Sequence, residues 1–535
     1  MGANFVRSVA EGSESLWTRT IYPRVLEDLV SRVTRIPGQT REMLVVRSPT
    51  TDRAIADVPI CSEDDVHLAQ SRARKVQSVW RSFSVEQRKE IILRFHDIVL
   101  RRQETILDLL QIETGKARRD AFEEVLDVAL VCQHYAFRAK SYLQPKWRKG
   151  ALPVLTRTWE LRHPVGVVGF ISPWNYPLTL TISDAIPAIL AGNAVILKPD
   201  SRTPLTALLG LRWLQEAGLP VDVFQIVTGS GASLGKTLIA GVDHICFTGS
   251  TATGRTIASQ AGQSLIKCSL ELGGKNPMLV MDDADLNKAV NGAIRGCFAN
   301  SGQLCISFER LLVQKNIYNV FLHEFVKKTK HLRIGPEKNL DVEMGSLISK
   351  EQLEKVEDHV RDAESKGARI LAGGRARPDL GPFFYEPTIL VDVTKDMKVF
   401  QQETFGPVVA VTRVADGEEA ICMANDSAFG LNASIWTGNV TQGRKMAARI
   451  RCGTVNINES YAATWGSVDA PMGGMKASGV GRRHGIEGFA KFTEAQTVAV
   501  QSFIPVGPWP FTSGALYARV MTAALRLLKH IPGLR

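Results

Sequence analysis

Between residues 165 and 249, short apolar runs rich in β-branched residues alternate with longer helical stretches, and this alternation constrains the fold more than any other feature. Each helical stretch ends in glycine, which suits the left-handed position that follows a helix. The alternation repeats at roughly 20–30 residues and predicts an α/β fold with a parallel, doubly wound sheet. The runs are VGVVGFI (165–171), NAVILK (193–198), DVFQIV (222–227) and DHICFTG (243–249).

Polar and small residues follow these predicted strands where a ligand site would form. Ligands of such sheets bind beyond the carboxyl ends of the strands. Asn175 follows the first run, Lys198 ends the second, and Gly249 follows the fourth. We therefore expect these three residues to face one cleft.

The rest of the chain predicts further regions around this sheet. Residues 63–145 have helical spacing of apolar residues, most clearly in 84–115, and residues 1–45, which lack a period, are interpreted as a surface extension. A second αβ region spans about 278–484. Its predicted strands are 310–314, 368–373, 408–414, 432–438 and 453–458.

Two further segments alternate polar and apolar residues as exposed strands do, namely 156–164 and 492–501. They close no predicted sheet, so they predict either pairing across a subunit contact or surface hairpins within one subunit. The tail, 515–535, is a basic amphipathic helix. It predicts packing against the protein's own oligomer, which we favour, or contact with a membrane surface.

Composition excludes several classes of protein. The net charge is +11, but basic residues are interleaved with acidic ones without a basic, aromatic-rich run, which argues against nucleic acid as a partner. The eight cysteines contain no CxxC pair, so we expect reduced thiols, no disulfide framework and no metal site. The N-terminus lacks a secretory h-region and no uncharged apolar run is long enough to span a membrane, which predicts a cytoplasmic protein.

The segment FTGSTATGRT (247–256) reads as a strand, a glycine turn and a helix start, where backbone N–H groups can face phosphate. A dinucleotide-binding turn, a P-loop and a plain tight turn all fit this pattern. The P-loop interpretation is weakened by Arg255, which stands where a compact lysine charge is needed between phosphates.

Two other segments carry candidate catalytic groups, SLELGGKNP (269–277) and NSGQLCISFER (300–310). Their glycines allow close backbone approach to a ligand. A cysteine nucleophile needs a thiolate, a donor for oxyanion charge and a base. Cys305, Asn175 and Glu271 could supply these, although spacing alone does not distinguish them from a buried thiol and a surface carboxylate.

From about residue 45 to 503 the chain resembles the aldehyde dehydrogenase superfamily. The resemblance is carried, in family order, by SPWNYP (172–177), GNAVILKPDS (192–201), FTGSTATG (247–254), ELGGKNP (271–277), NSGQLC (300–305), ETFGPV (403–408) and PMGGMKASGVGR (471–482).

The resemblance implies a Rossmann-like cofactor domain, a second α/β catalytic domain and a small β oligomerisation flap, and thus a homodimer or homotetramer. The domain boundaries that it implies are 1–44 for an N-terminal extension, 45–141 with 165–273 for the cofactor domain, 274–486 for the catalytic domain, 142–164 with 487–503 for the flap, and 504–535 for the tail.

The resemblance also implies the chemistry: oxidation of an aldehyde to a carboxylic acid with NAD or NADP. Cys305 would attack the carbonyl to give a thiohemiacetal, with Asn175 and the Cys305 N–H holding the oxyanion. Hydride would pass to the cofactor, and Glu271 would activate water to hydrolyse the thioester. The cofactor contacts implied are Trp174, Lys198, Pro199, Asp200, Ser201, Gly231, Gly249, Ser250, Leu272, Glu403 and Phe405.

Ser201 indicates which cofactor is used. Relatives with a KPxE motif have a glutamate there, which repels a 2′-phosphate. A hydroxyl beside Lys198 tolerates that dianion, so NADP is expected, whereas an inward-turned Asp200 would restore NAD.

The residues in and around these motifs are most similar to those of a second type of NADP-dependent succinate-semialdehyde dehydrogenase, so succinate semialdehyde is the expected substrate. Ser478 matches that family's carboxylate-binding serine, but Ser183 and Ala299 stand at its arginine positions. Arg310 or Arg482 could substitute, or the substrate could be a less polar aliphatic or aromatic aldehyde. Arg483 replaces a glutamate thought to relay protons in many relatives. A non-catalytic member of the fold and a P-loop-like nucleotide hydrolase remain as alternatives.

Overall fold

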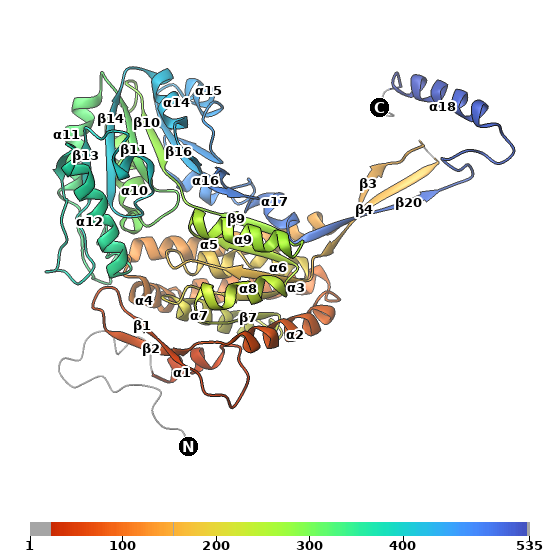
Figure 1. Cartoon of the computed structure of the whole chain (residues 1–535), viewed down its shortest axis with the longest axis horizontal. Helices are drawn as coiled ribbons and strands as arrows, with labels where there is room; N and C mark the ends of the chain where they lie inside the picture. Colours follow the sequence, from red (N-terminus) through yellow and green to blue (C-terminus); the bar gives the residue numbers. More distant parts are fainter. Residues whose placement is uncertain (1–22, 153–154, 532–535) are drawn as a thin grey trace.

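A computed structural model describes residues 23–152 and 155–531. Its body contains two α/β units, and a long β arm leaves the body and ends beside a separate C-terminal helix (Figure 1). The α/β fold class expected from the alternating pattern is confirmed.

The first unit is built on a six-stranded sheet with the order β19-β9-β8-β5-β6-β7. All neighbours are parallel except β19, which runs antiparallel to β9. The four predicted apolar runs form β8, β5, β6 and the edge strand β7, whose residues are almost all buried, as those of parallel strands are. The strands are β5 (Val167–Ile171), β6 (Ala194–Lys198), β7 (Phe224–Ile226), β8 (His244–Thr248), β9 (Lys267–Glu271) and β19 (Gly479–Val480).

Helices cover this sheet. The helical run predicted for 84–115 is divided at Arg102, whose backbone leaves helical geometry. Gly115 then ends α4 with a φ of +73°, at a place where a Cβ would lie 2.1 Å from Ser346 Oγ. The helices are α2 (Glu63–Trp80), α3 (Val85–Arg101), α4 (Gln103–Thr114), α5 (Arg118–Leu143), the π-helix η1 (Thr179–Ser183), α6 (Ile186–Ala191), α7 (Pro204–Glu216), α8 (Gly231–Ala240) and α9 (Thr251–Gln263).

The interpretation of residues 1–45 as a surface extension is wrong for the part that the structure describes. Helix α1 (Pro23–Ser31) places Leu29 in the core of the first unit, and Val33 follows it there. The helix is short, so its apolar period is too brief to stand out in the sequence. Strands β1 (Met43–Arg47) and β2 (Ala54–Pro59) form a hairpin beside it, and residues 1–22 lie outside the described residues.

The second unit contains a seven-stranded sheet with the order β12-β13-β14-β11-β10-β16-β17, parallel except for β12. Its strands are β10 (Asn276–Val280), β11 (Phe308–Gln314), β12 (Arg369–Ala372), β13 (Thr388–Val391), β14 (Val408–Val414), β16 (Asn432–Trp436) and β17 (Thr454–Ile457). A small pair, β15 (Phe429–Gly430) and β18 (Met475–Lys476), lies beside it. Its helices are α10 (Leu286–Phe298), the 3₁₀ turn η2 (Ala299–Gly302), α11 (Tyr318–Thr329), α12 (Lys350–Ser365), α13 (Lys398–Gln401), α14 (Gly417–Asn425), α15 (Val440–Ala447), α16 (Ala462–Gly466) and, next to the first unit, α17 (Gly485–Ala490).

The arm is a three-stranded antiparallel sheet of β3 (Lys146–Lys149), β4 (Thr156–Pro164) and β20 (Thr493–Gln501). The two exposed strands predicted to close no sheet of their own therefore pair with each other. Helix α18 (Gly514–Leu528) lies beyond the arm, and none of its residues is buried (Figure 1). Among the described residues, no helix combines the length and apolar character that crossing a membrane requires.

Candidate active site

The loop before Cys305 has an unusual backbone. Asn300, Ser301 and Gly302 have φ angles of +49°, +56° and +71°, in the left-handed region that costs energy for residues with a side chain. Hydrogen bonds hold this shape: the Asn300 N–H donates to Asp120 Oδ2 at 2.9 Å, and Ser301 Oγ donates to the Gly345 carbonyl at 2.9 Å. The loop thus presents Cys305 from a constrained turn.

Cys305 is a partly exposed free thiol at this turn. Its carbonyl accepts a hydrogen bond from Asn276 Nδ2 at 2.7 Å. Burial raises the pKa of the Cys305 thiol to about 12, and the carboxylates of Glu403 and Glu271 add to that shift. The thiol is therefore protonated at neutral pH and must lose its proton before it can act as a nucleophile.

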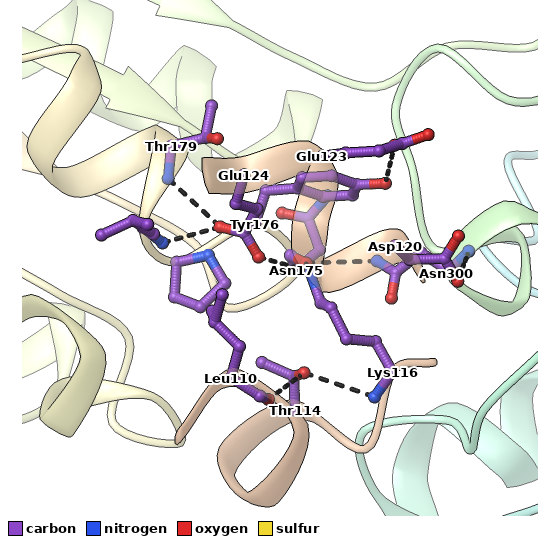
Figure 2. A network of polar contacts seen from close by, with 12 residues as sticks. Leu110, Thr114, Lys116, Asp120, Glu123, Glu124, Asn175, Tyr176, Thr179 and Asn300 are labelled. Carbon is purple, nitrogen blue, oxygen red and sulfur yellow. Dashed lines mark hydrogen bonds and ion pairs between the residues drawn. The ribbon is translucent and has the colours of Figure 1, made fainter. Parts of the chain in front are cut away.

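Asn175 follows β5 and is buried against the same loop. Its carbonyl accepts hydrogen bonds from Lys116 Nζ at 2.7 Å and from Asn300 Nδ2 at 3.1 Å, as Figure 2 shows. Its side-chain Nδ2 donates to the Gln303 carbonyl at 3.1 Å. Because an amide nitrogen carries two hydrogens, a second donor remains near Cys305.

Glu271 is the last residue of β9 and pairs with Gly479 of β19. Its Oε1 is buried and accepts no hydrogen bond from any described residue. Burial raises the pKa of Glu271 to about 7. A carboxyl group with this pKa exchanges protons readily near neutral pH, as a general base must.

An acidic stripe on α5, which sequence analysis missed, contacts the segments that carry Asn175 and Cys305. Glu124 forms a buried ion pair with Lys116 (2.6 Å) and accepts the Leu178 N–H at 2.7 Å. Its neighbour Glu123 accepts hydrogen bonds from the hydroxyls of Tyr176, as Figure 2 shows, and of Tyr461. The spacing of the carboxylates, three and four residues apart along one face of the helix, is the signal that could have revealed the stripe. Its members are Asp120, Glu123, Glu124 and Asp127.

The predicted adenosine end of the cofactor site lies after β6. Lys198 is buried, and its ammonium forms no hydrogen bond or ion pair within the described part of the chain. Ser201 Oγ donates to the Gly229 carbonyl at 3.1 Å. Arg202, which sequence analysis also missed, binds Asp200 through Nε at 2.9 Å and Nη2 at 3.1 Å. Its guanidinium therefore neutralises the carboxylate that would favour NAD. Asp200 also acts electrostatically on the Lys198 ammonium, and Pro199 stands between the two in the sequence.

Two helices begin at the same edge of the sheet. Gly231 opens α8 with open space where a Cβ would stand, and Ser250 caps α9 by accepting the Thr253 N–H. The N–H of Gly249 donates to the Glu271 carbonyl at 3.0 Å, which ties this turn to β9. Both helix starts suit a pyrophosphate. Arg255 is exposed on α9, so it does not take the place of a P-loop lysine.

The nicotinamide end predicted from sequence is also assembled in one place. Glu403 Oε1 accepts the Gly274 N–H at 2.8 Å, and burial raises the pKa of Glu403 to about 7. Phe405 has a φ of +57°, and its ring packs edge-to-face with the Trp174 ring, with the ring centroids 5.5 Å apart. Leu272 is buried under Gly254, where a Cβ would lie 2.5 Å from its side chain.

Two side chains predicted to bind the substrate carboxylate, Ser478 and Arg310, already form hydrogen bonds with the backbone. Ser478 is fully buried, donates to the Gly273 carbonyl at 2.7 Å and accepts the Gly430 N–H at 3.0 Å, so its hydroxyl hydrogen is already used. Arg310 is buried and binds backbone carbonyls, including those of Lys275 and Ala424. The geometry therefore lends no support to Ser478 or Arg310 as substrate ligands.

Cys305 instead packs against an apolar cluster. The cluster brings together residues of both units and of the 460–472 segment. Ala299, one of the two positions where an arginine was expected, belongs to it. Its buried members are Tyr176, Leu180, Ala299, Leu304, Ile306, Leu431, Tyr461, Trp465 and Met472.

Known proteins resemble the chain along most of its length. The model of the aldehyde dehydrogenase family matches residues 36–498. A protein of Mycolicibacterium smegmatis named "Putative succinate-semialdehyde dehydrogenase [NADP(+)]" is 47% identical over 493 residues, covering 92% of this chain and 95% of the relative. One from Sinorhizobium fredii, named a "Probable" enzyme of the same kind, is 36% identical and covers 85% and 92%.

Solved structures agree with these sequences. The crystal structure of an NADP-dependent enzyme of E. coli has a TM-score of 0.84 at 33% identity, covering 89% of this chain and 99% of that one. Betaine aldehyde dehydrogenase from Staphylococcus aureus, in complex with NAD+, has a TM-score of 0.84 at 30% identity and covers 91% and 99%. With the thiol, the amide and the carboxylate at the meeting of its two α/β units, this chain belongs to the aldehyde dehydrogenase family.

Proposed function

We propose that the protein oxidises succinate semialdehyde to the dicarboxylic acid with NADP, using Cys305 as nucleophile and Glu271 as base. The proposal rests on the electrostatics and the geometry around Cys305. Glu271 and Glu403 both act on the pKa of the Cys305 thiol, and Asn175 is bonded to the same turn. A nucleophile, a base and an oxyanion donor are thus within reach of one substrate carbonyl.

The steps follow from these groups. The Cys305 thiol gives its proton to the Glu271 carboxylate, which releases it to solvent before it acts again, and the sulfur forms a bond to the aldehyde carbon as the carbonyl π electrons move to oxygen. The Asn175 amide with the Cys305 N–H binds the resulting oxyanion. NADP, when bound, would supply the hydride acceptor that this adduct needs in order to become a thioester. Glu271 takes a proton from water as the water oxygen attacks the thioester carbon, and the C–S bond then breaks. The acid leaves and Cys305 regains its thiol.

The adenosine end supports NADP as the cofactor. Lys198 is a buried cation without a partner in the described structure, Ser201 brings no negative charge, and Arg202 holds Asp200. A 2′-phosphate would therefore meet net positive charge. The relatives from M. smegmatis and S. fredii carry NADP in their names.

A second candidate substrate class rests on the apolar cluster beside Cys305. Ser478 and Arg310 are already bonded to backbone groups and are not left to bind a second carboxylate, and burying that charge unpaired is costly. A less polar aliphatic or aromatic aldehyde would gain from the same surface.

One assay separates the two candidates. Absorbance at the wavelength of reduced cofactor is followed with NADP or NAD and with succinate semialdehyde or butanal, which has the same chain length without the acid. We expect the highest kcat/KM with NADP and succinate semialdehyde. A higher kcat/KM for butanal would favour the second candidate, and no reduction with any aldehyde would refute the proposal.

Assembly is part of the proposal. The outer edges of β3 and β20 are unpaired within the described chain, and such edges pair readily with another strand. We infer that a second copy adds to the arm, giving a homodimer or homotetramer, with α18 packed against that assembly. Light scattering on the full chain and on a chain ending at 503 tests this, and a monomeric full chain would refute it.

The contact of α18 with a membrane surface is the competing proposal for the tail. Its polar face carries Arg519, Arg526 and Lys529, and residues 495–535 contain no acidic side chain. Sedimentation with anionic vesicles distinguishes the two, since binding by the assembled full chain would favour the membrane. A cytoplasmic location completes the proposal and is supported by eight free cysteines.

A further inference from the structure

A buried cluster of charges lies behind Glu271. Arg483 and Asp184 form an ion pair, with Nη2 and Oδ1 2.7 Å apart and side chains only 10% and 18% exposed. Arg483 follows β19, the strand that pairs with Glu271, and Asp184 follows η1. Met472, which forms a β-bridge with Arg483, precedes Gly473, where a Cβ would lie 3.0 Å from Glu271 Oε1, so the segment paired with Arg483 runs beside this carboxylate.

This cluster is incompletely hydrogen-bonded within the described structure. Arg483 Nε, Glu271 Oε1 and both ring nitrogens of His484 are buried without a partner there. A small cavity lies beside Arg483 and His484, and its charged and polar lining residues include Ser183, Asp184 and Lys491. Because Glu271 Oε1 accepts no hydrogen bond from the described residues, burial and the charged neighbours act on Glu271 in place of hydrogen bonds.

The two charges of the pair act on Glu271 in opposite directions. Burial raises the pKa of Glu271 most, Arg483 lowers that pKa, and Asp184 raises it. The pKa of Arg483 is itself raised, because Asp184, Asp127 and Glu271 outweigh the effect of its burial. The charged and titratable groups that face Glu271 are Lys491, Arg483, Asp184, Arg482, Cys246 and Cys305.

We propose that the buried Arg483–Asp184 pair is a positioning device that sets the pH at which Glu271 becomes an effective base for thioester hydrolysis. Arg483 favours the ionised carboxylate, and Asp184 limits that effect while keeping the guanidinium in place. Neither residue bonds to the substrate. The inference rests on the proposed function, because it assigns these two residues to the hydrolytic half of that reaction.

The test uses p-nitrophenyl acetate, which acylates a reactive thiol without any cofactor. A burst of p-nitrophenol reports acylation of Cys305, and the steady rate that follows reports hydrolysis of the acetyl thioester. Both are followed from pH 5 to 9 at the wavelength where p-nitrophenol and its anion absorb equally. In the wild type the steady rate should rise through about pH 7, the pKa of Glu271, and this part of the pH profile is its rising limb.

Four variants make the test specific. Arg483→Gln should move the rising limb up by about one pH unit, and Asp184→Asn should move it down. Arg483→Lys keeps the charge and should restore the wild-type limb. The double variant Arg483→Gln/Asp184→Asn is neutral overall and should lie within about half a unit of the wild type. Arg482→Gln is the matched control and should shift the limb less than Arg483→Gln.

The outcomes separate the inference from the proposed function. A normal burst with the limb unmoved in both single variants would overturn the inference alone. A shift of both single variants in the same direction would also overturn it, because lost packing rather than charge would then be the cause. The absence of any burst in the wild type would instead refute Cys305 as nucleophile, and the inference would fall with it.

Discussion

The two sides of the active cleft support their reactive groups in opposite ways. On the Cys305 side, the Asp120 carboxylate accepts the Asn300 N–H, and the side-chain amides of Asn276 and Gln303 donate to the carbonyls of Cys305 and Asn300. On the Glu271 side, the carboxylate has a buried oxygen that accepts no hydrogen bond from the described residues, and charged neighbours surround it.

The difference matches the work of each group. A nucleophile must be held at one position relative to the carbonyl, and hydrogen bonds to a strained turn achieve this. A base must gain and lose a proton and meet a water molecule, so firm bonds to its oxygens would oppose its role. The first side is therefore expected to respond to lost contacts, and the second to changes in charge and pH.

The largest expected effect comes from removing the sulfur. Cys305→Ala should lower kcat for aldehyde oxidation more than about a thousandfold, because no other group can form the covalent adduct. Cofactor reduction measures this directly. Cys422→Ala, at an exposed thiol on α14, is the control and should retain wild-type turnover. Substantial activity in Cys305→Ala would contradict the assignment.

Removal of the oxyanion donor should have the next largest effect. Asn175→Ala deletes the side-chain amide but keeps the backbone carbonyl that Lys116 and Asn300 bind. We expect kcat to fall about 100- to 1000-fold, or about 3–4 kcal/mol in barrier. Single-turnover rates measure the loss. An unchanged rate would mean that the Cys305 N–H alone holds the oxyanion.

A smaller effect is expected from the support of the turn. Asp120→Ala leaves the Asn300 N–H without its acceptor in a left-handed turn, which should lower kcat about tenfold and destabilise the protein by about 1–3 kcal/mol. Asp120→Asn retains an acceptor oxygen and is the matched control. Equal losses in both variants would show that charge on α5, rather than the hydrogen bond, holds the nucleophile loop.

The sequence predicts the features that depend on a short run of residues, and it does not predict those that depend on contacts between distant segments. Strands β5, β6, β7 and β8 were predicted because each is a short apolar run bounded by turn residues. Cys305, Glu271 and Asn175 were predicted together because motifs of the family carry them. The bond from Asn300 to Asp120 of α5 and the use of Ser478 in backbone bonds join residues far apart in the chain, so no local pattern encodes them.

The smallest expected effect concerns stability and belongs to the Glu271 side. A carboxyl group whose pKa is about 7 in the folded protein and near 4.5 in the unfolded chain binds more protons when folded. Its burial therefore costs little below pH 4.5, and the cost grows as the pH rises toward 7. Glu271→Gln removes the titration while keeping the shape, so the variant should lose thioester hydrolysis yet become more stable than the wild type at alkaline pH.

The size of that gain follows from the pKa. Between pH 5.5 and 8 the wild type should lose about 2 kcal/mol of unfolding free energy that Glu271→Gln keeps. Urea unfolding of both proteins at the two pH values measures the difference, and Glu403→Gln, whose carboxyl has a similar pKa, provides a comparison that keeps the base. If Glu271→Gln followed the same pH dependence as the wild type, Glu271 would already be ionised and stabilised in the folded protein. The contrast between a bonded nucleophile and an unbonded base would then be wrong, because hydrogen bonds would hold both sides of the cleft.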